Sequence, residues 1–330
     1  MTFHTSRRRF LVGTSAAIGA ASVGAPAVLR GQDAMPRVTY VTFATGYNVV
    51  LNEWMAAKRY DLKRGVNIDV INSYSSVSNY YNDLTAGTFD LGIGSWDTFA
   101  QRYLAGVPLK LVCTINNYDI LRVVALEGGP SSLEDLKGKT LGATLSSGAY
   151  RIMKLAARDF HKIELEKDVK VQNVESPAAA VTMVIGGAID AGQSWEPNIS
   201  VGESKNPKLR SIYNLGEDFL KNAGFAMPYF GFALRKEVAD KYPGVGPKIA
   251  ASMNDCINGV MANLDEAVAL AAPKMKLEPA VLKKAFTSGR LVFRPGSMSD
   301  STSRKTVKSA ADYLTKNQVL SKPLDDGFFI

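Results

Sequence analysis

A segment that occurs twice, one hundred residues apart, constrains the fold of this chain more than any other feature. The first copy, residues 87–97, reads Gly-Thr-Phe-Asp-Leu-Gly-Ile-Gly-Ser-Trp-Asp, and the second, residues 187–196, reads Gly-Ala-Ile-Asp-Ala-Gly-Gln-Ser-Trp-Glu. Each copy follows a helical stretch and predicts a helix-ending glycine, a short strand and a turn with the sequence Ser-Trp-acid. A solenoid would repeat at a shorter period. The repeat therefore predicts two similar lobes.

The remaining pattern fits two α/β lobes. A chain of 330 residues exceeds one ordinary core and suits two lobes of roughly 100–150 residues each. From residue 37, short apolar strands alternate with helices, one of which runs through Trp54 to near Gly65; this is typical of βαβ units and a largely parallel sheet. After residue 237 we expect helices packed on one or both lobes. The predicted strands cover residues 38–43, 67–71, 90–94, 109–115, 121–126, 140–144, 169–171, 189–192 and 229–234.

The two Ser-Trp-acid turns mark a candidate ligand cleft. In open α/β sheets, ligands bind beyond the carboxyl ends of the strands, and both turns, the first beginning at Ser95, follow predicted strands. We interpret Trp96 and Trp195 as walls that stack on a ligand, with core packing as the alternative. Asp97 and Glu196 would suit a cationic group, but capping of the following helices explains both acids equally well.

A third polar turn, Ser146-Ser147-Gly148, follows a predicted strand and opens a helix. The free N–H groups at such a helix start favour an anionic or carbonyl group, and ordinary helix capping is the alternative.

Composition and charge argue against several other classes of protein. The chain is 46% hydrophobic and 21% charged, as in soluble globular proteins. Without the arginines at 7–9, which lie in a segment that we expect to be removed, 36 basic and 31 acidic residues remain, interspersed along the chain. Nucleic-acid binding needs a clustered basic footprint, and the sequence has none.

Cysteine and histidine are too few for most metal or nucleophile chemistry. The sequence has two of each, whereas a zinc site takes about four nitrogen and sulfur ligands, or three and a water. A Cys-His nucleophile would need Cys113 or Cys256 beside His161, but Cys113 lies in an apolar strand and suits a core position. A disulfide between the two cysteines stays open, because sequence cannot supply its geometry.

The N-terminus has the pattern of an export signal. Ser-Arg-Arg-Arg-Phe-Leu at 6–11 precedes a weakly apolar stretch, and Ala-Pro-Ala at 25–27 is a small-residue cleavage site, so residues 1–27 are predicted as a signal peptide cleaved after Ala27. The paired arginines resemble the twin-arginine (Tat) signal, which implies a periplasmic protein. A retained membrane anchor is the alternative, although glycine, serine and proline make this stretch a poor spanning helix.

Five motifs in order resemble one known family over nearly the whole exported chain. The chain is similar to the nitrate/sulfonate/taurine and thiamine-precursor (NMT1/THI5-like) solute-binding proteins of ABC importers, a branch of the type II periplasmic-binding-protein fold. The motifs are Gly-Tyr-Asn at 46–48, Ala-Gly-x-x-Asp at 86–90, Gly-Val-Pro-Leu-Lys at 106–110, Leu-x-Asp-Leu-Lys-Gly-Lys at 133–139 and Gly-x-x-Asp-Ala at 187–191.

The resemblance implies two α/β lobes joined by two hinge strands, with residues 37–118 plus 228–330 in lobe 1 and residues 119–227 in lobe 2. It implies a monomer without cofactor that closes around a small organic ligand and then docks on an ABC permease of the inner membrane. It also places several loops in the cleft. Tyr229 and Phe230, near the return crossing, are expected either as hinge residues that line the cleft or as core residues. Besides the two turns, the implied contacts are Tyr47, Asn48, Ser75, Ser76, Ser146, Ser147, Gly148, Tyr150 and Tyr229.

The ligand and one alternative function stay open. A sulfonate or nitrate would be expected to meet a cation, yet only Arg151 stands near these loops, which favours a neutral, aromatic or amine-bearing ligand such as a pyrimidine. Hydroxyls and amides can also bind an anion without a cation. The alternative is an enzyme resembling thiamine-pyrimidine synthases, which the chain's lack of a cysteine-rich metal-binding segment disfavours. A regulator's effector domain would require a DNA-binding helix-turn-helix in place of the export signal.

Overall fold

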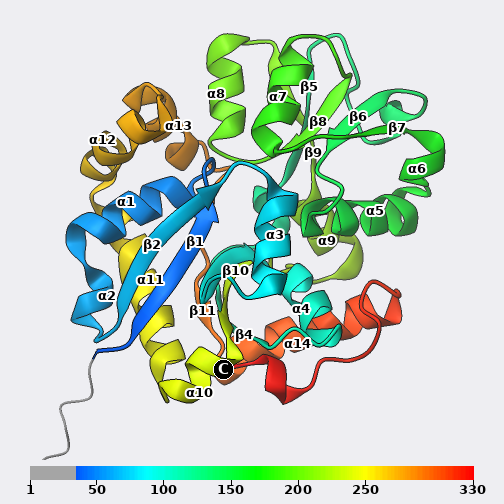
Figure 1. Ribbon diagram of the computed structural model, residues 1–330. Coiled ribbons are helices and arrows are strands. Elements are labelled where there is room, and N and C mark those ends of the chain that lie inside the picture. The colour runs from blue at the N-terminus through cyan, green and yellow to red at the C-terminus, as the bar shows by residue number, and fades with distance from the viewer. Residues whose placement is uncertain (1–34) are drawn as a thin grey trace, which may run out of the picture. The chain divides into compact units, whose positions relative to one another are not determined.

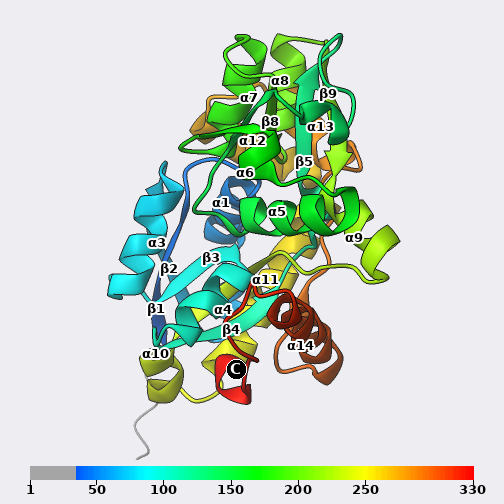
Figure 2. The ribbon, with the colours of Figure 1, turned by 90° about the vertical axis from the view of Figure 1, so that its right-hand side faces the viewer.

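The computed structural model describes residues 35–330, which form one unit with two β-sheets. The predicted signal peptide, its cleavage site after Ala27 and the alternative membrane anchor lie outside the described residues. In Figures 1 and 2 the five-stranded sheet lies above the six-stranded sheet, and helices cover both. We call the part built on the six-stranded sheet the first lobe and the part built on the five-stranded sheet the second lobe.

The six-stranded sheet of the first lobe has the strand order β11-β4-β10-β3-β1-β2. Strand β1 runs parallel to β2 and β3, whereas β10 runs antiparallel to β3 and β4. The short β11 pairs with β4 at the other edge. The bounds are β1 (Arg37–Phe43), β2 (Asn67–Tyr74), β3 (Leu91–Ser95), β4 (Leu109–Thr114), β10 (Phe230–Arg235) and β11 (Gly296–Ser297).

The five-stranded sheet of the second lobe repeats this arrangement in the order β7-β6-β8-β5-β9. Here β6 is parallel to β7 and β8, and β5 is antiparallel to β8 and β9. The bounds are β5 (Arg122–Leu126), β6 (Thr140–Ala143), β7 (Lys170–Asn173), β8 (Ala191–Ser194) and β9 (Leu209–Asn214).

Both sheets are therefore mixed, which corrects the predicted largely parallel sheet. The antiparallel strands have a common origin, because β5 enters the second lobe from the first and β10 returns from the second lobe to the first. In the lobe that it joins, each of these two strands runs antiparallel to both of its neighbours in the sheet. The prediction of two α/β lobes joined by two crossing strands is confirmed.

The helices agree with the sequence pattern in most places and depart from it in two. The single helix predicted to end near Gly65 is two helices, since Arg59 has a left-handed backbone with a φ of 51°. Helix α8 follows Pro197, as the capping alternative for Glu196 led us to expect, whereas strand β9 and helix α9 were not predicted. The bounds are α1 (Asn48–Lys58), α2 (Tyr60–Lys63), α3 (Val77–Ala86), α4 (Trp96–Leu104), α5 (Gly148–His161), α6 (Leu165–Asp168), α7 (Pro177–Ile185), α8 (Asn198–Lys205), α9 (Leu215–Ala223), α10 (Lys236–Lys241), α11 (Val245–Ala262), α12 (Leu264–Met275), α13 (Pro279–Thr287) and α14 (Ser301–Lys316), with 3₁₀ turns η1 (Tyr118–Ile120), η2 (Glu134–Leu136) and η3 (Asp326–Phe328).

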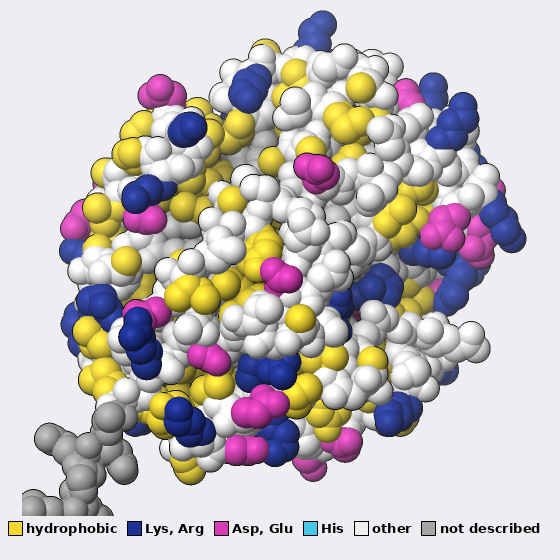
Figure 3. Space-filling model, viewed as in Figure 1, with side chains coloured by type: hydrophobic (Ala, Val, Ile, Leu, Met, Phe, Trp, Pro, Cys, Tyr) yellow, Lys and Arg dark blue, Asp and Glu magenta, His cyan; other side chains and the backbone are white. Residues whose placement is uncertain are grey.

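The C-terminal helices pack on both lobes, as the sequence led us to expect. Helices α11 and α12 contact α1 of the first lobe, and α13 contacts α8 of the second. Among residues 35–330, no helix is long and apolar enough to cross a membrane. On the face drawn in Figure 3, Lys and Arg side chains are interspersed with Asp and Glu.

The glycine and aspartate of the repeat have the same structural role in both lobes. Gly87 and Gly187 end helices α3 and α7 with φ angles of 77° and 71°, which glycine adopts without strain. Asp90 accepts hydrogen bonds from the backbone N–H of Thr39 at 2.8 Å and from its hydroxyl at 2.7 Å. Asp190 accepts from the backbone N–H of Thr140 at 2.7 Å. Asp90 thus ties the start of β1 to the start of β3, and Asp190 ties the start of β6 to the start of β8.

Replacing Asp90 by alanine is expected to lower the free energy of unfolding by about 1–3 kcal/mol, because a partly buried N–H and hydroxyl lose their acceptor. Asp190→Ala should cost less, since this more exposed aspartate accepts one such bond. Urea titrations of both variants measure the difference. Equal losses would contradict the unequal roles of the two copies.

His161 ties together three segments of the second lobe. Its Nδ1 lies 2.6 Å from Oε1 of Glu134 in η2, and its Nε2 lies 2.9 Å from Oδ2 of Asp218 in α9. The Tyr213 hydroxyl donates to the same Asp218 oxygen at 2.7 Å. Burial acts to lower the pKa of His161, but the hydrogen bonds to Asp218 and Glu134 outweigh it, so the pKa is raised. The imidazole is therefore occupied by structural contacts.

This network predicts a pH-dependent stability. A histidine with a raised pKa in the folded state contributes stability that is fully present below its unfolded pKa of about 6.5. The contribution is lost as the pH rises through the folded pKa. The difference in unfolding free energy between wild type and His161→Gln should therefore be largest near pH 6 and shrink toward pH 9, as urea titrations across this range would measure. A difference that grows with pH would contradict the assignment.

Candidate functional site

A narrow cavity lies between the lobes, where strands of both sheets end. Parallel strands β1, β2 and β3 end at one edge of the first sheet, and the strands β6, β7 and β8 end at the facing edge of the second. The cavity offers about 20 Å³ to the centre of a water-sized sphere, room for about one water. A larger ligand therefore needs the lobes to separate before it enters. The lining residues are Phe43, Thr45, Tyr74, Ser75, Val77, Tyr81, Ser95, Tyr229 and Phe230 from the first lobe and its crossings, and Ser147, Gly148, Ser176, Pro177 and Trp195 from the second.

Three helices begin at this cavity, each capped by a serine. The hydroxyls of Ser76, Ser147 and Ser176 accept from the backbone N–H of the third residue of α3, α5 and α7, at 3.4, 3.2 and 3.3 Å respectively. The earlier N–H groups of each helix have no carbonyl partner within the helix. These N–H groups and the positive ends of three helix dipoles favour a ligand group that accepts hydrogen bonds.

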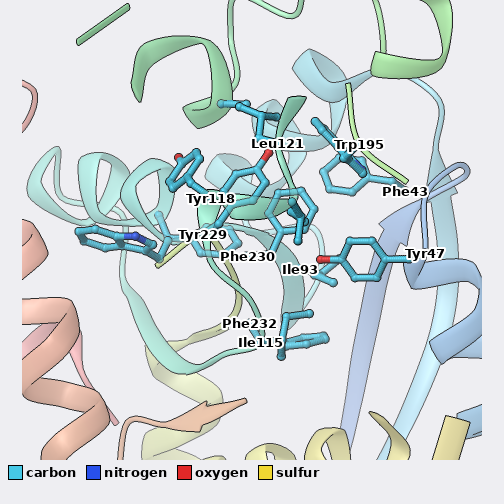
Figure 4. Packing of buried hydrophobic residues seen from close by; sticks show 14 of the residues in the cluster. Phe43, Tyr47, Ile93, Ile115, Tyr118, Leu121, Trp195, Tyr229, Phe230 and Phe232 are labelled. Atoms are coloured by element: carbon cyan, nitrogen blue, oxygen red, sulfur yellow. The ribbon is translucent and has the colours of Figure 1, made fainter. Parts of the chain in front are cut away.

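An aromatic cluster forms one wall of the cavity. The Trp195 ring meets Tyr229 and Phe230 edge-on, with centroids 6.1 and 5.6 Å apart. Tyr229 stacks in turn on Tyr118, with centroids 4.1 Å apart. In Figure 4, Trp195 and Phe43 lie together on one side of this cluster. Because two of these tyrosines lie on the segments that cross between the lobes, the wall joins the cavity to the crossings.

The two tryptophans of the repeat have different surroundings. Trp195 lines the cavity, with 8% of its surface exposed. Trp96 does not line it; its ring is fully buried and its Nε1 donates to the carbonyl of Pro228 at 2.7 Å. In the first copy the helix begins at Trp96 itself, whereas in the second the helix begins only after Pro197 and leaves Trp195 in the loop. The core alternative therefore describes Trp96.

Asp97 is completely buried and its carboxylate is fully engaged. Its Oδ2 accepts from Nη2 and Nε of Arg151 at 3.0 and 3.3 Å. Its Oδ1 accepts from the Tyr118 hydroxyl at 2.9 Å and from the Ser95 hydroxyl. The side chain also stands in the first turn of α4, as the capping alternative predicted. No oxygen of Asp97 is left for a cationic ligand.

Glu196 is engaged in the same way. Its Oε1 accepts from Nε of Arg290 at 2.6 Å, and its Oε2 accepts from the backbone N–H of Ser200 in the first turn of α8 at 3.0 Å. This carboxylate is also fully buried. Both acids therefore pair with arginines, and Glu196 also accepts from the start of a helix, so the inclination toward an amine-bearing ligand loses its support.

The other predicted contacts divide between the cavity and its surroundings. Ser75, Ser95, Ser147, Gly148 and Tyr229 line the cavity, while Ser76 caps α3 beside it. The remaining four, Tyr47, Asn48, Ser146 and Tyr150, do not line the cavity and make other contacts. The Tyr47 hydroxyl accepts from Asn116 at 2.6 Å, and Asn48 donates to Thr42 and to the carbonyl of Phe43. The Ser146 hydroxyl lies 3.0 Å from that of Ser78, and the Tyr150 hydroxyl donates to Glu166 at 3.3 Å.

Sequence reasoning missed two of the second lobe's five lining residues, Ser176 and Pro177 at the start of α7. Ser176 followed by Pro177 after a predicted strand is a recognisable helix start, equivalent to the Ser147 turn, and would have found it. It also missed the apolar residues that line the cavity, because the sequence pattern does not distinguish apolar residues that face a cavity from those in the core. Those residues are Phe43, Tyr74, Val77 and Tyr81, with Thr45 beside them, whereas Phe230 had been expected there as a hinge or core residue.

The cysteines lie outside the cavity. Cys113 and Cys256 are free and buried, and burial raises the pKa of each thiol to about 12. Neither is a thiolate near neutral pH, and His161 contacts Glu134 and Asp218 instead. Within residues 35–330, no group of three or more His, Cys, Asp or Glu side chains is placed to hold a metal ion.

Solved structures show the class of fold. The aliphatic sulphonate binding protein SsuA of Escherichia coli superposes with a TM-score of 0.68 at 16% identity, covering 88% of this chain and 95% of that one. The alkanesulfonate-binding protein SsuA of Xanthomonas axonopodis pv. citri, bound to MOPS, gives 0.69 at 17% identity, covering 87% and 94%. The described chain thus has the two-lobed fold of periplasmic solute-binding proteins.

A family model and curated relatives agree with this class. Residues 56–213 match the family described as NMT1/THI5 like. A Brucella abortus protein named as a candidate binding protein is 25% identical over 252 residues, covering 73% of this chain and 74% of that one. The family match and the solved structures therefore agree with the resemblance predicted from the motifs.

Proposed function

We propose that this chain is an extracytoplasmic receptor that captures a small organic solute between its lobes and delivers it to an ABC permease. The observation that carries the proposal is the cavity itself, because it is lined from both lobes at the carboxyl ends of their strands. The names of similar proteins support the same role. Binding without catalysis also accords with cysteines that are buried and protonated and a histidine that holds the second lobe together.

The two crossings between the lobes suit a hinge. They pair with each other: the Tyr118 N–H donates to the Met227 carbonyl at 2.9 Å, and the Tyr229 N–H donates to the Asn116 carbonyl at 2.9 Å. We propose that residues 37–118 plus 228–330 and residues 119–227 move as the two lobes about this pair of segments. Rotation there would widen the cavity enough to admit a ligand.

The lining favours a flat ligand that carries a hydrogen-bond acceptor. The residues around the cavity are aromatic, apolar or hydroxyl-bearing, and none of the described lining residues is charged. The helix starts at Ser76, Ser147 and Ser176 offer N–H donors, whereas both nearby carboxylates are bound by arginine. We propose an aromatic or pyrimidine-like solute with a carbonyl, carboxylate or sulfonate group, in preference to an amine.

A thermal-shift screen of the exported form tests this proposal. Nicotinate, nicotinamide and 3-picolylamine share one ring and differ in the attached group, and butanesulfonate tests the acceptor without the ring. The acid or the amide should stabilise the protein, by about 2.7 kcal/mol at 100 times its Kd, and the amine should not. Stabilisation by the amine alone would overturn the ligand class, and no stabilisation by sulfonates, pyrimidines, aromatic acids or amines would overturn the receptor.

Location and assembly are proposed on the same basis. We expect a monomer that reaches the periplasm through residues 1–27 by twin-arginine export. Fractionated cells should contain the processed chain in the periplasm, and light scattering should give the mass of one chain. Replacing Arg7 and Arg8 by lysine should leave the chain in the cytoplasm; unchanged export would point to the Sec route.

A further inference from the structure

The acids of the two Ser-Trp-acid turns form ion pairs that join the lobes reciprocally. Asp97, after β3 of the first lobe, meets Arg151 of α5 in the second lobe at 3.0 Å. Glu196, after β8 of the second lobe, meets Arg290 at 2.6 Å. Arg290 lies between α13 and β11, a strand of the first sheet. Equivalent positions of the repeat thus each take an arginine from the opposite lobe.

Each arginine is fixed by more than its acid. Nη2 of Arg151 also donates to the Thr98 hydroxyl at 2.7 Å. Nη2 of Arg290 also donates to the Ser200 hydroxyl at 3.1 Å, and its Nη1 lies 3.0 Å from Glu203. A guanidinium held by two or more groups of the other lobe defines the position of that lobe better than a single contact would.

The burial of the pairs makes them sensitive to opening. Both carboxylates are 0% exposed, while the arginine side chains are 24% and 20% exposed. A buried carboxylate without its partner is strongly unfavourable, so the lobes cannot separate at these points unless water reaches the acids. The pairs lie on different flanks of the cleft: in Figure 1, α4 lies beside α5 on one flank and α13 beside α8 on the other.

We propose that Arg151 and Arg290 are positioning residues that hold the two lobes closed through Asp97 and Glu196. The proposal rests on the proposed function, because it assigns the contacts that fix the closed form of that receptor. Neither arginine lines the cavity. They act on the position of the lobes, and the ligand gains affinity from a cleft that already favours closure.

A cross-link between the lobes can measure closure without any ligand. The hydroxyls of Ser78 in α3 and Ser146 in the second lobe are 3.0 Å apart across the cleft. In the Ser78→Cys, Ser146→Cys protein, the rate of disulfide formation under a mild oxidant reports how often the lobes are closed. The native thiols are buried with a pKa of about 12 and do not compete.

Adding Arg151→Gln and Arg290→Gln together should slow this cross-linking at least tenfold, and either substitution alone should slow it less. The double variant Asp97→Asn, Glu196→Gln keeps the shapes of both side chains and should also slow the cross-linking. It serves as the test if the Arg151→Gln, Arg290→Gln protein fails to fold. Arg158→Gln is the matched control, because Arg158 lies on α5 but pairs with its neighbour Asp159. Its cross-linking rate should not change.

An unchanged rate in folded double variants would overturn the assignment of the arginines. The receptor proposal would survive that result if the screen still finds a stabilising solute. Conversely, slower cross-linking together with a screen in which nothing binds would support the closure contacts and contradict the receptor. The two proposals therefore fail separately.

Discussion

Trp195→Ala is expected to lose at least about tenfold in affinity for the solute that best stabilises the protein, while Trp96→Ala keeps that affinity and loses stability. The difference follows from their placement, since Trp195 lines the cavity beside Tyr229 and Phe230 and Trp96 does not. Aromatic contacts contribute about 0.5–1.5 kcal/mol beyond the area they bury. The ligand surface that Trp195 would cover also becomes exposed to water, which adds to the loss of binding free energy.

Trp96→Ala should lower the free energy of unfolding by about 3–5 kcal/mol, as expected for a large, fully buried aromatic side chain. It also leaves the Pro228 carbonyl without the indole donor that reaches it at 2.7 Å. Calorimetric titration measures the affinity and urea unfolding the stability of each variant. If Trp96→Ala weakened binding as much as Trp195→Ala in folded protein, the assignment of one tryptophan to the cavity and the other to the core would be wrong.

Gly148→Ala is expected to weaken binding by about 5- to 150-fold. A Cβ atom at this position would overlap the Ser95 hydroxyl and lie 2.5 Å from Oδ1 of Asp97, both on the opposite lobe. These atoms belong to the buried network with Tyr118 and Arg151 and have little room to move. Overpacking of this kind costs typically 1–3 kcal/mol, and here the cost applies only when the cleft is closed.

In the open form of the Gly148→Ala protein, the added methyl group does not overlap Ser95 and Asp97. The free energy of unfolding should therefore change less than the free energy of binding. Gly186→Ala is a suitable control, because it adds the same methyl group in the second lobe at an ordinary 3.4 Å contact. Titration of both variants with the same solute makes the comparison. An affinity equal to that of the control would show that Gly148 does not approach the first lobe when the ligand binds.

Much of the fold was predictable because the repeat and the strand–helix alternation are local patterns. The Gly-x-x-Asp segments were found from sequence, and the structure explains them by a helix-ending glycine and a tie between strands. The direction of β5 and β10 was not predictable, since it depends on which lobe each crossing strand joins. Strand β9 was missed because its sequence, Leu-Arg-Ser-Ile-Tyr-Asn, lacks the alternation of apolar and polar residues that indicates a strand.

The site was predictable in place but not in detail. Strand ends and serine-capped helix starts located the cavity, and Ser147, Gly148 and Trp195 lie in it. The partners of Asp97 and Glu196 were beyond reach, because Arg151 and Arg290 come from the opposite lobe and no local pattern links them. The repeat therefore predicts where the two lobes face each other, whereas the contacts between the lobes are seen only in the structure.

On the proposed function, a solute enters only when the two lobes open, and one comparison tests this requirement directly. The Ser78→Cys, Ser146→Cys protein, oxidised before the solute is added, would hold shut a cavity with room for about one water. Calorimetry should then show binding of the best solute from the screen to the reduced protein and none to the oxidised protein, with binding restored by reductant. Equal binding to both forms would contradict the claim.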